Sequence, residues 1–303
     1  MKSSENISSK RIVVSYTTLP SRYNVLKESM LSMTKQTRKP DAIYLALPNK
    51  ATRLGKEYPT LPDDIINMCT VINTEVDYGP ITKIYGALIS ETDPNTIIIS
   101  CDDDVFFDPH FIEILLKHHL DHPKSCICGT GALIGRGLFF ISIVSTVKPF
   151  DRWKGFTGFT VDEKNGRKID LIFGVAGVLY TRSMFPSNEN LYDELLQHSM
   201  NDDTIFHNDD VLISGYLSKN GIERRIFNDI PAIHHANGED ALSIDVFKMI
   251  RRMSTSIDNV KKLGFFTTME ESDILETPAA RVIFTLIISV IIIILSFFLY
   301  KII

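Results

Sequence analysis

Three consecutive aspartates at the end of an apolar run constrain this chain more than any other feature. The run from Ile97 to Cys101 is typical of a buried β-strand, and it leads directly into Asp102, Asp103 and Asp104. Adjacent carboxylates repel one another, so a fold gains nothing by grouping them unless a cation or a bound substrate relieves the repulsion. In α/β sheets, ligand sites lie at the carboxyl ends of strands. The cluster therefore predicts a site for Mg²⁺ or Mn²⁺, which commonly bridge a carboxylate to a diphosphate; a solvated acidic turn is the alternative.

The composition is that of a globular protein without an electrostatic preference for nucleic acid. The chain has 303 residues, of which 44% are apolar and 23% are charged, enough for one large domain or two small ones. The net charge of −5 gives no case for nucleic acid as a partner. The four cysteines lack zinc-finger spacing and lie in apolar, strand-like segments. We expect buried thiols in a reducing compartment.

A long apolar segment near the end of the sequence predicts a membrane anchor. No charged residue occurs from Val282 to Tyr300, and Arg281 and Lys301 flank this stretch. Roughly 19 helical residues span most of a hydrocarbon core of about 30 Å. The polar N-terminal segment has no signal-peptide pattern. We therefore predict one transmembrane helix within residues 281–303, with the preceding domain held on the cytosolic side of a membrane, as the basic residues before the span also suggest.

Strand and helix patterns alternate over roughly the first 120 residues. The segments expected as buried strands are Arg11–Tyr16, Ala42–Leu47, Val71–Asn73 and Ile97–Ser100. Helical spacing of apolar residues follows at Tyr23–Met33, Ile81–Leu88 and after Pro109, and later at Asp209–Lys219. This alternation predicts an α/β fold with a mostly parallel sheet flanked by helices. We place the domain at 11–264, after a disordered segment 1–10 and before a linker at 265–280.

Polar groups follow the first strand and open a later helix. Thr17, Thr18 and Arg22 offer hydrogen-bond donors at a strand end, and a Gly79-Pro80 turn precedes a helix whose first turn holds Lys83. The free amides of a helix start, together with an ammonium group, suit a phosphate. The alternatives are a solvated turn and an ordinary helix start, since Gly-Pro before a helix is common.

Two further polar segments occur in the second half of the chain. Asp209 and Asp210 begin a predicted helix, where carboxylates are also favourable through the helix dipole and capping alone. His234 and His235 follow an apolar segment as a strand end would. A ligand pair and a structural histidine pair are both open interpretations.

In this order, the segments resemble those of a nucleotide-sugar glycosyltransferase of the GT-A type, similar to glycosyltransferase family 2, from about Arg11 to Ala241. The resemblance implies a GT-A (Rossmann-like) fold and the transfer of a sugar from a nucleotide-sugar donor to an acceptor hydroxyl with Mn²⁺ or Mg²⁺. The three aspartates match the family's DxD motif. Carried over, Asp104 would bind the metal directly, Asp102 would contact the ribose or a metal-bound water, and Asp103 would lie between them.

The same resemblance assigns the remaining residues. Asp210 would be the general base on the acceptor hydroxyl, as in inverting members, and Asp209 stands where that family usually has Glu. His235, or else His234, would approach the metal or the diphosphate. The donor-binding residues implied are Thr17, Thr18, Arg22, Asp77, Gly79, Lys83, Asp102, Asp103 and Gly177. The acceptor, which is a glycan, a lipid-linked group or a protein, and the sugar, the base and the stereochemistry stay open.

Two other functions compete with this interpretation. A haloacid-dehalogenase-like phosphatase also has Asp-x-Asp after a buried strand, but here the strand lies far from the N-terminus and Phe106 stands where that family requires Thr or Val. The other is a membrane-tethered protein that binds a nucleotide sugar without turning it over.

Overall fold

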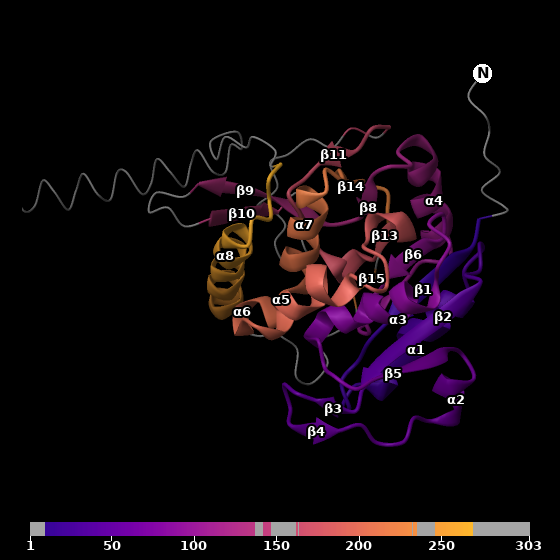
Figure 1. Cartoon of the computed structure of the whole chain (residues 1–303). Coiled ribbons are helices and arrows are strands. Elements are labelled where there is room, and N and C mark those ends of the chain that lie inside the picture. Colours follow the sequence, from indigo (N-terminus) through magenta and orange to yellow (C-terminus); the bar gives the residue numbers. More distant parts are fainter. Residues whose placement is uncertain are drawn as a thin grey trace, which may run out of the picture.

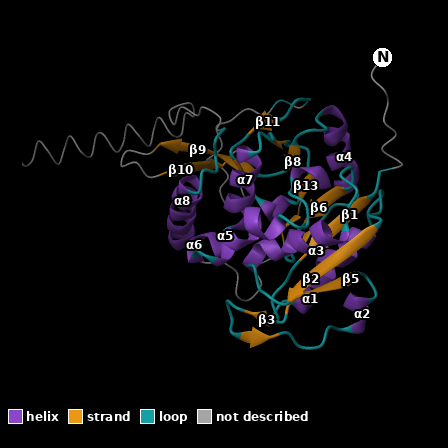
Figure 2. Cartoon of the chain, in the orientation of Figure 1, coloured by secondary structure: helices purple, strands orange, loops and turns teal. Residues whose placement is uncertain are grey.

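A mixed β-sheet with helices on both faces forms the centre of the protein (Figures 1 and 2). The computed structural model describes residues 10–136, 142–146, 162, 164–231, 233–234 and 246–268. Within these residues, the main sheet has eight strands in the order β11 (Arg167–Lys168), β14 (Arg224–Ile226), β8 (Cys126–Cys128), β13 (Val178–Thr181), β6 (Ile97–Ser100), β1 (Ile12–Tyr16), β2 (Ala42–Pro48) and β5 (Thr70–Thr74).

The four neighbouring strands from β6 to β5 form a parallel half of the main sheet. β1 pairs in parallel with both β2 and β6, and β2 pairs in parallel with β5. β13 runs antiparallel between β6 and β8, while β8 and β14 are again parallel. The prediction of an α/β fold with a mostly parallel sheet is confirmed for the described residues.

Smaller sheets and the helices complete the described architecture. The small sheets are β10 (Ser142–Thr146), β9 (Gly131–Arg136) and β12 (Leu171–Ile172); β15 (Ile233–His234) with β7 (Val105–Phe106); and β3 (Lys50–Ala51) with β4 (Lys56–Glu57). The α-helices are α1 (Tyr23–Thr34), α2 (Asp63–Ile66), α3 (Thr82–Ser90), α4 (Phe111–Asp121), α5 (Gln197–Met200), α6 (Asp203–Phe206), α7 (Asp209–Lys219) and α8 (Val246–Lys262). A π-helical segment, Tyr192–Leu196, precedes α5.

The central strands are apolar at successive positions because helices cover both faces of the sheet. Val13 and Ile98 pack in the apolar cluster that includes α3 and α7. Their neighbours Val14 and Ile99 point the other way, into the cluster that includes α1 and α4. Near-continuous apolar runs are what strands buried on both faces require, which explains why these runs predicted the strands well.

The chain reverses its direction of travel across the sheet between β1 and β6. From β1 it proceeds outward through β2 to β5, and then returns to place β6 on the other side of β1. In α/β folds, the carboxyl ends of two such neighbouring strands are the usual position of a ligand site. Residues 17–22 follow β1, and the three aspartates follow β6.

Helix α8 packs beside α6 and α7 (Figure 1). Gly215 of α7 makes this contact close, since a Cβ there would lie 2.6 Å from Val260 Cγ1 of α8. After α8, Phe266 is buried, and the backbone N–H of Thr268 donates to the Ser218 hydroxyl. The packed chain thus continues through Thr268, into the segment 265–280 that the sequence analysis assigned to a linker.

None of the helices in the described ranges combines the length and the apolar character needed to span a membrane. The apolar stretch Val282–Tyr300 lies outside the described residues, as do residues 1–9, so the anchor and the disordered N-terminal segment stay predictions.

Candidate active site at the carboxyl ends of β1 and β6

Arg22 joins the segment after β1 to the segment after β6. Its Nη1 lies 2.9 Å from Asp103 Oδ1, and its Nη2 contacts Asp104 Oδ2. The Thr18 hydroxyl donates a hydrogen bond to the other oxygen of Asp103. The side chain of Asp103 is 6% exposed, whereas that of Asp104 is 25% exposed. Asp103 is therefore a buried anchor, and Asp104 is the more accessible carboxylate.

Lys83 gathers a second group of carboxylates from distant parts of the chain. It lies in the first turn of α3, and its Nζ is 2.8 Å from both Asp102 Oδ1 and Asp209 Oδ2. Asp210 Oδ1 lies 3.9 Å from the same nitrogen. The Lys83 side chain is only 5% exposed, so these carboxylates take the place of water around its charge. The fold thereby brings together the acidic cluster and the start of α7, which the sequence predicted as separate motifs.

Asp209 and Asp210 have different surroundings although they are neighbours at the start of α7. The Asp209 side chain is 9% exposed and faces Lys83, whereas that of Asp210 is 27% exposed. The backbone N–H of Gly174 donates to Asp210 Oδ1 at 3.1 Å. Asp210 is thus oriented by the backbone and still open on one side, as a group that reacts with a ligand must be.

The site carries more negative than positive charge. Five carboxylates, Asp102–Asp104 and Asp209–Asp210, surround the two cations Arg22 and Lys83, which leaves a formal charge of −3 when every group is ionised. Burial, with the adjacent aspartates adding to it, raises the pKa of Asp103 to about 7 against the opposing effect of Arg22. Burial and the charge of Asp209 raise the pKa of Asp210 to about 8. Burial alone would lower the pKa of Lys83, but the surrounding carboxylates outweigh it and raise that pKa well above its usual value.

Gly174, which the sequence analysis did not select, lies closer to this network than the predicted Gly177. A Cβ at position 174 would be 2.6 Å from Lys83 Nζ and 3.3 Å from Asp102 Oδ1. At Gly177 the backbone φ is +68°, and a Cβ would meet the ring of Phe111 at 2.4 Å, so this glycine permits packing against the core. Gly174 begins a single 3-10 turn, Gly174–Ala176, and Gly177 follows it.

Thr17, Asp77 and Gly79 have structural roles at the rim of the site. The Thr17 hydroxyl donates to the carbonyl of Ala46 at 2.8 Å. Asp77 accepts the backbone N–H groups of Thr52 at 2.7 Å and Gly79 at 2.8 Å, so it fixes the turn before α3. Gly79 has φ +76°, a conformation that favours glycine. Asp77 and Gly79 thus shape the turn that leads to the helix of Lys83, and no hydrogen bond or ion pair among the described residues joins Thr17, Asp77 or Gly79 to the carboxylates around Lys83.

Of the two histidines that the sequence analysis selected, one is among the described residues. His234 is the last residue of β15 and pairs with Val105 of β7, directly after Asp104. His235 lies outside the described residues.

The carboxylates suit a hard cation in type but are engaged with protein cations in this structure. Oxygen ligands are what Mg²⁺ and Mn²⁺ require, and the excess negative charge favours a dication. Within the described ranges, however, no group of three or more His, Cys, Asp or Glu side chains is arranged to hold a metal by itself. Mg²⁺ commonly binds through one or two carboxylates together with phosphates and waters, and a bound Mg²⁺ or Mn²⁺ at this site stays a prediction.

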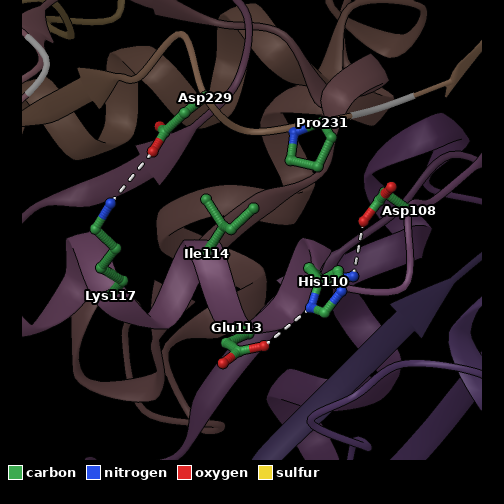
Figure 3. A pocket seen from close by; sticks show the side chains of 7 residues that line it. All are labelled: Asp108, His110, Glu113, Ile114, Lys117, Asp229 and Pro231. Atoms are coloured by element: carbon green, nitrogen blue, oxygen red, sulfur yellow. Dashed lines mark hydrogen bonds and ion pairs between the residues drawn. The ribbon is translucent and has the colours of Figure 1, made fainter.

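A separate surface hollow lies beside α4 (Figure 3). Its volume is about 650 Å³, and His110, Glu113, Lys117 and Asp229 are among the residues that line it. Lys117 and Glu113 each pair with a neighbouring side chain within it, as Figure 3 shows. None of the predicted site residues lines this hollow, so it is not part of the network around Lys83.

Comparison with known proteins leaves the family of this chain open. No protein-family model matches the chain, and no curated protein sequence matches it. Among solved structures, the crystal structure of S. aureus TarS 1-349 is similar with a TM-score of 0.43 and 14% sequence identity. The match covers 72% of this chain and 58% of the TarS chain, so this chain spans less than two thirds of that structure.

Proposed function

We propose that this protein is a metal-dependent glycosyltransferase of the GT-A type that transfers a sugar from a nucleotide-sugar donor to an acceptor hydroxyl. The observation that carries the proposal is the network around Lys83 and Arg22. It unites the three aspartates after β6 with the carboxylates at the start of α7, at the point where the strand order reverses. Motifs that resemble those of such enzymes in sequence are thus adjacent in space, at the place where this fold class binds nucleotides.

The donor's diphosphate would bind near Arg22 and Lys83, the two cations of the network. Arg22 offers a planar guanidinium beside Asp104, and the ammonium group of Lys83 lies in the first turn of α3. Arginine binds phosphate oxygens in pairs. Thr18 and Asp103 are buried and would hold the Arg22 side chain in place.

A divalent cation held by Asp104 and Asp102, with His235 as a further proposed ligand, would neutralise the charge that develops on the departing nucleoside diphosphate. The carboxylates fit this role because they outnumber the cations around them. Asp103 stays with Thr18 and Arg22 and keeps the segment after β6 in position.

Asp210 is the proposed general base. It would accept the proton of the acceptor hydroxyl while the hydroxyl oxygen forms a bond to the anomeric carbon. The bond from that carbon to the diphosphate breaks, and its electron pair leaves with the diphosphate oxygen. A pKa raised to about 8 suits a base that works near neutral pH, and the N–H of Gly174 fixes the orientation of the carboxylate. Attack from the face opposite the leaving group would invert the configuration.

A membrane location is part of the proposal. If the apolar stretch from Val282 to Tyr300 spans a membrane, the site is held beside the lipid surface on the cytosolic side. Such a position suits a lipid-linked or membrane-protein acceptor, and a glycan acceptor is equally compatible with the chemistry.

The test is a transfer assay with the full-length chain and a panel of nucleotide sugars, with and without Mn²⁺ or Mg²⁺. We expect Asp210→Asn to lower the transfer rate by roughly 10²–10⁴ while the donor still binds. Asp104→Asn should weaken cation-dependent donor binding by about tenfold or more. Asp121→Asn, at the exposed end of α4, is the matched control and should behave as the wild type.

Two results would contradict the proposal. One is the absence of cation-dependent affinity for every nucleotide sugar in the panel. The other is release of phosphate from phosphomonoesters, which would favour the phosphatase alternative. If nucleotide sugars bind but no acceptor is glycosylated and no sugar is released, the protein is a binding protein rather than an enzyme.

A further inference from the structure

Of the two cations in the site, Arg22 is the one that a ligand can draw away from its carboxylate. Lys83 forms an ion pair with Asp209, which is buried. If Lys83 moved away, the buried charge of Asp209 would have no counterion in contact with it. Arg22 instead contacts Asp104, whose side chain is 25% exposed and can be solvated. Asp103 is also buried, but Arg22 holds it through Nη1 and holds Asp104 through Nη2, so the contact with Asp104 can be exchanged while that with Asp103 is kept.

Arg22 also has hydrogen-bonding capacity that the free protein leaves unused. Its Nε is buried and has no hydrogen-bond partner among the described residues. A guanidinium carries five N–H donors in a fixed planar arrangement. This arrangement matches two oxygens of one phosphate better than it matches single oxygens from two different carboxylates. Arg22 is also the residue before the first turn of α1, and no side chain caps that helix start. The backbone amides of this turn would add to the attraction for an anion.

We propose that Arg22 is an exchangeable internal counterion, an inference that rests on the proposed function. In the free protein, Arg22 neutralises Asp103 and Asp104. When the donor binds together with its cation, Arg22 gives up Asp104 and donates its N–H groups to the diphosphate, which leaves Asp104 free to act as a ligand. Arg22 should therefore oppose binding of a divalent cation alone and support binding of the diphosphate.

The two effects have opposite signs, and this makes the proposal testable without measuring activity. Binding of Mn²⁺ alone to the full-length chain is measured from the electron paramagnetic resonance signal of free Mn²⁺. Binding of UDP, GDP, ADP, CDP and dTDP is then measured by calorimetry at saturating Mn²⁺. We expect Arg22→Gln to bind Mn²⁺ alone about tenfold more tightly and to bind the best of these diphosphates about tenfold more weakly.

Two control variants separate loss of charge from loss of structure. Arg22→Lys keeps a positive charge beside Asp104 and should bind Mn²⁺ alone as weakly as the wild type, yet it lacks the fork and should bind the diphosphate more weakly. Arg38→Gln removes a surface arginine that pairs with Asp41 at 3.5 Å and should change neither affinity. Thermal unfolding of each variant shows whether it is folded.

The possible outcomes distinguish this inference from the proposed function. If the wild type binds Mn²⁺ and a diphosphate but Arg22→Gln binds Mn²⁺ alone no more tightly, the exchange is refuted and the proposed function stands. If Arg22→Gln unfolds, Arg22→Lys still decides, because Mn²⁺ binding tighter than that of the wild type would refute the role of the charge. If the wild type binds no diphosphate of the panel in the presence of Mn²⁺, the proposed function fails as well.

Discussion

At the scale of single residues, Gly174 gives the ammonium group of Lys83 its space. A Cβ at this position would lie 2.6 Å from Lys83 Nζ and 3.1 Å from Asp210 Oδ1, so Nζ would have to shift within the carboxylates that surround it. We expect Gly174→Ala to weaken donor binding and lower kcat/KM by about tenfold, measured with the best donor of the panel. Gly129→Ala is the control, since its Cβ would meet only apolar atoms of Ala176 and Ile230. An equal loss of donor affinity in both variants would mean that Gly174 acts through general packing.

The sequence could predict which residues are chemically suited to the site, but not how they pair. The types and order of Asp102–Asp104, Lys83 and Asp210 were informative together, because each motif alone also has a structural explanation. That Arg22 bridges two of the aspartates depends on a contact over a sequence separation of 82 residues, which no local pattern encodes. The sequence also could not show that Gly174 rather than Gly177 lies beside Lys83, because this depends on which way the backbone turns after β12.

At the scale of elements, the contact between α7 and α8 depends on Gly215. Its missing side chain lets Val260 approach the helix that carries Asp209 and Asp210. We expect Gly215→Val to destabilise the fold by about 1–3 kcal/mol, because overpacking outweighs any change in helix propensity. Urea unfolding measures this change. Lys219→Gln, on the same helix and above the Phe265 ring, should change stability by about 0.5 kcal/mol or less, and an equal change in both would contradict the packing argument.

The elements that the sequence predicted well have a clear apolar pattern. β1, β2 and β6 are apolar at successive positions, and α1 and α3 have apolar residues at helical spacing, so pattern and structure agree. Strand order and direction could not be predicted for the half of the sheet from β11 to β13. β13 is antiparallel to both of its neighbours, yet its sequence is as apolar as that of a parallel strand. The two-residue strands, such as β11, are defined by their partners and have no pattern of their own.

At the scale of the whole molecule, two sets of buried groups make stability depend on pH in opposite directions. The pKa values of Asp103 and Asp210 are raised, mainly by burial, to about 7 and about 8. Between roughly pH 4 and these values the folded state binds more protons than the unfolded state, so the free energy of unfolding falls as the pH rises. Burial lowers the pKa of His118, His198 and His207, so these residues reduce stability only when the pH falls below about 6.5.

The range from about pH 7.5 to 8.5 isolates the carboxylates, because histidines with an ordinary pKa of about 6.5, or a lowered one, are almost neutral in both states there. We expect the free energy of unfolding of the metal-free protein to decrease over this range, by no more than about 1.4 kcal/mol per pH unit for each proton. Asp210→Asn should show a smaller slope, since it removes the group that titrates last. Asp64→Asn is the control: its hydrogen bond with Lys27 lowers the pKa of Asp64, so that carboxylate is ionised throughout and the slope should stay that of the wild type. Urea unfolding in EDTA at several pH values measures all three, and a wild-type slope in Asp210→Asn would show that Asp210 is already ionised in the folded protein at about pH 7.5.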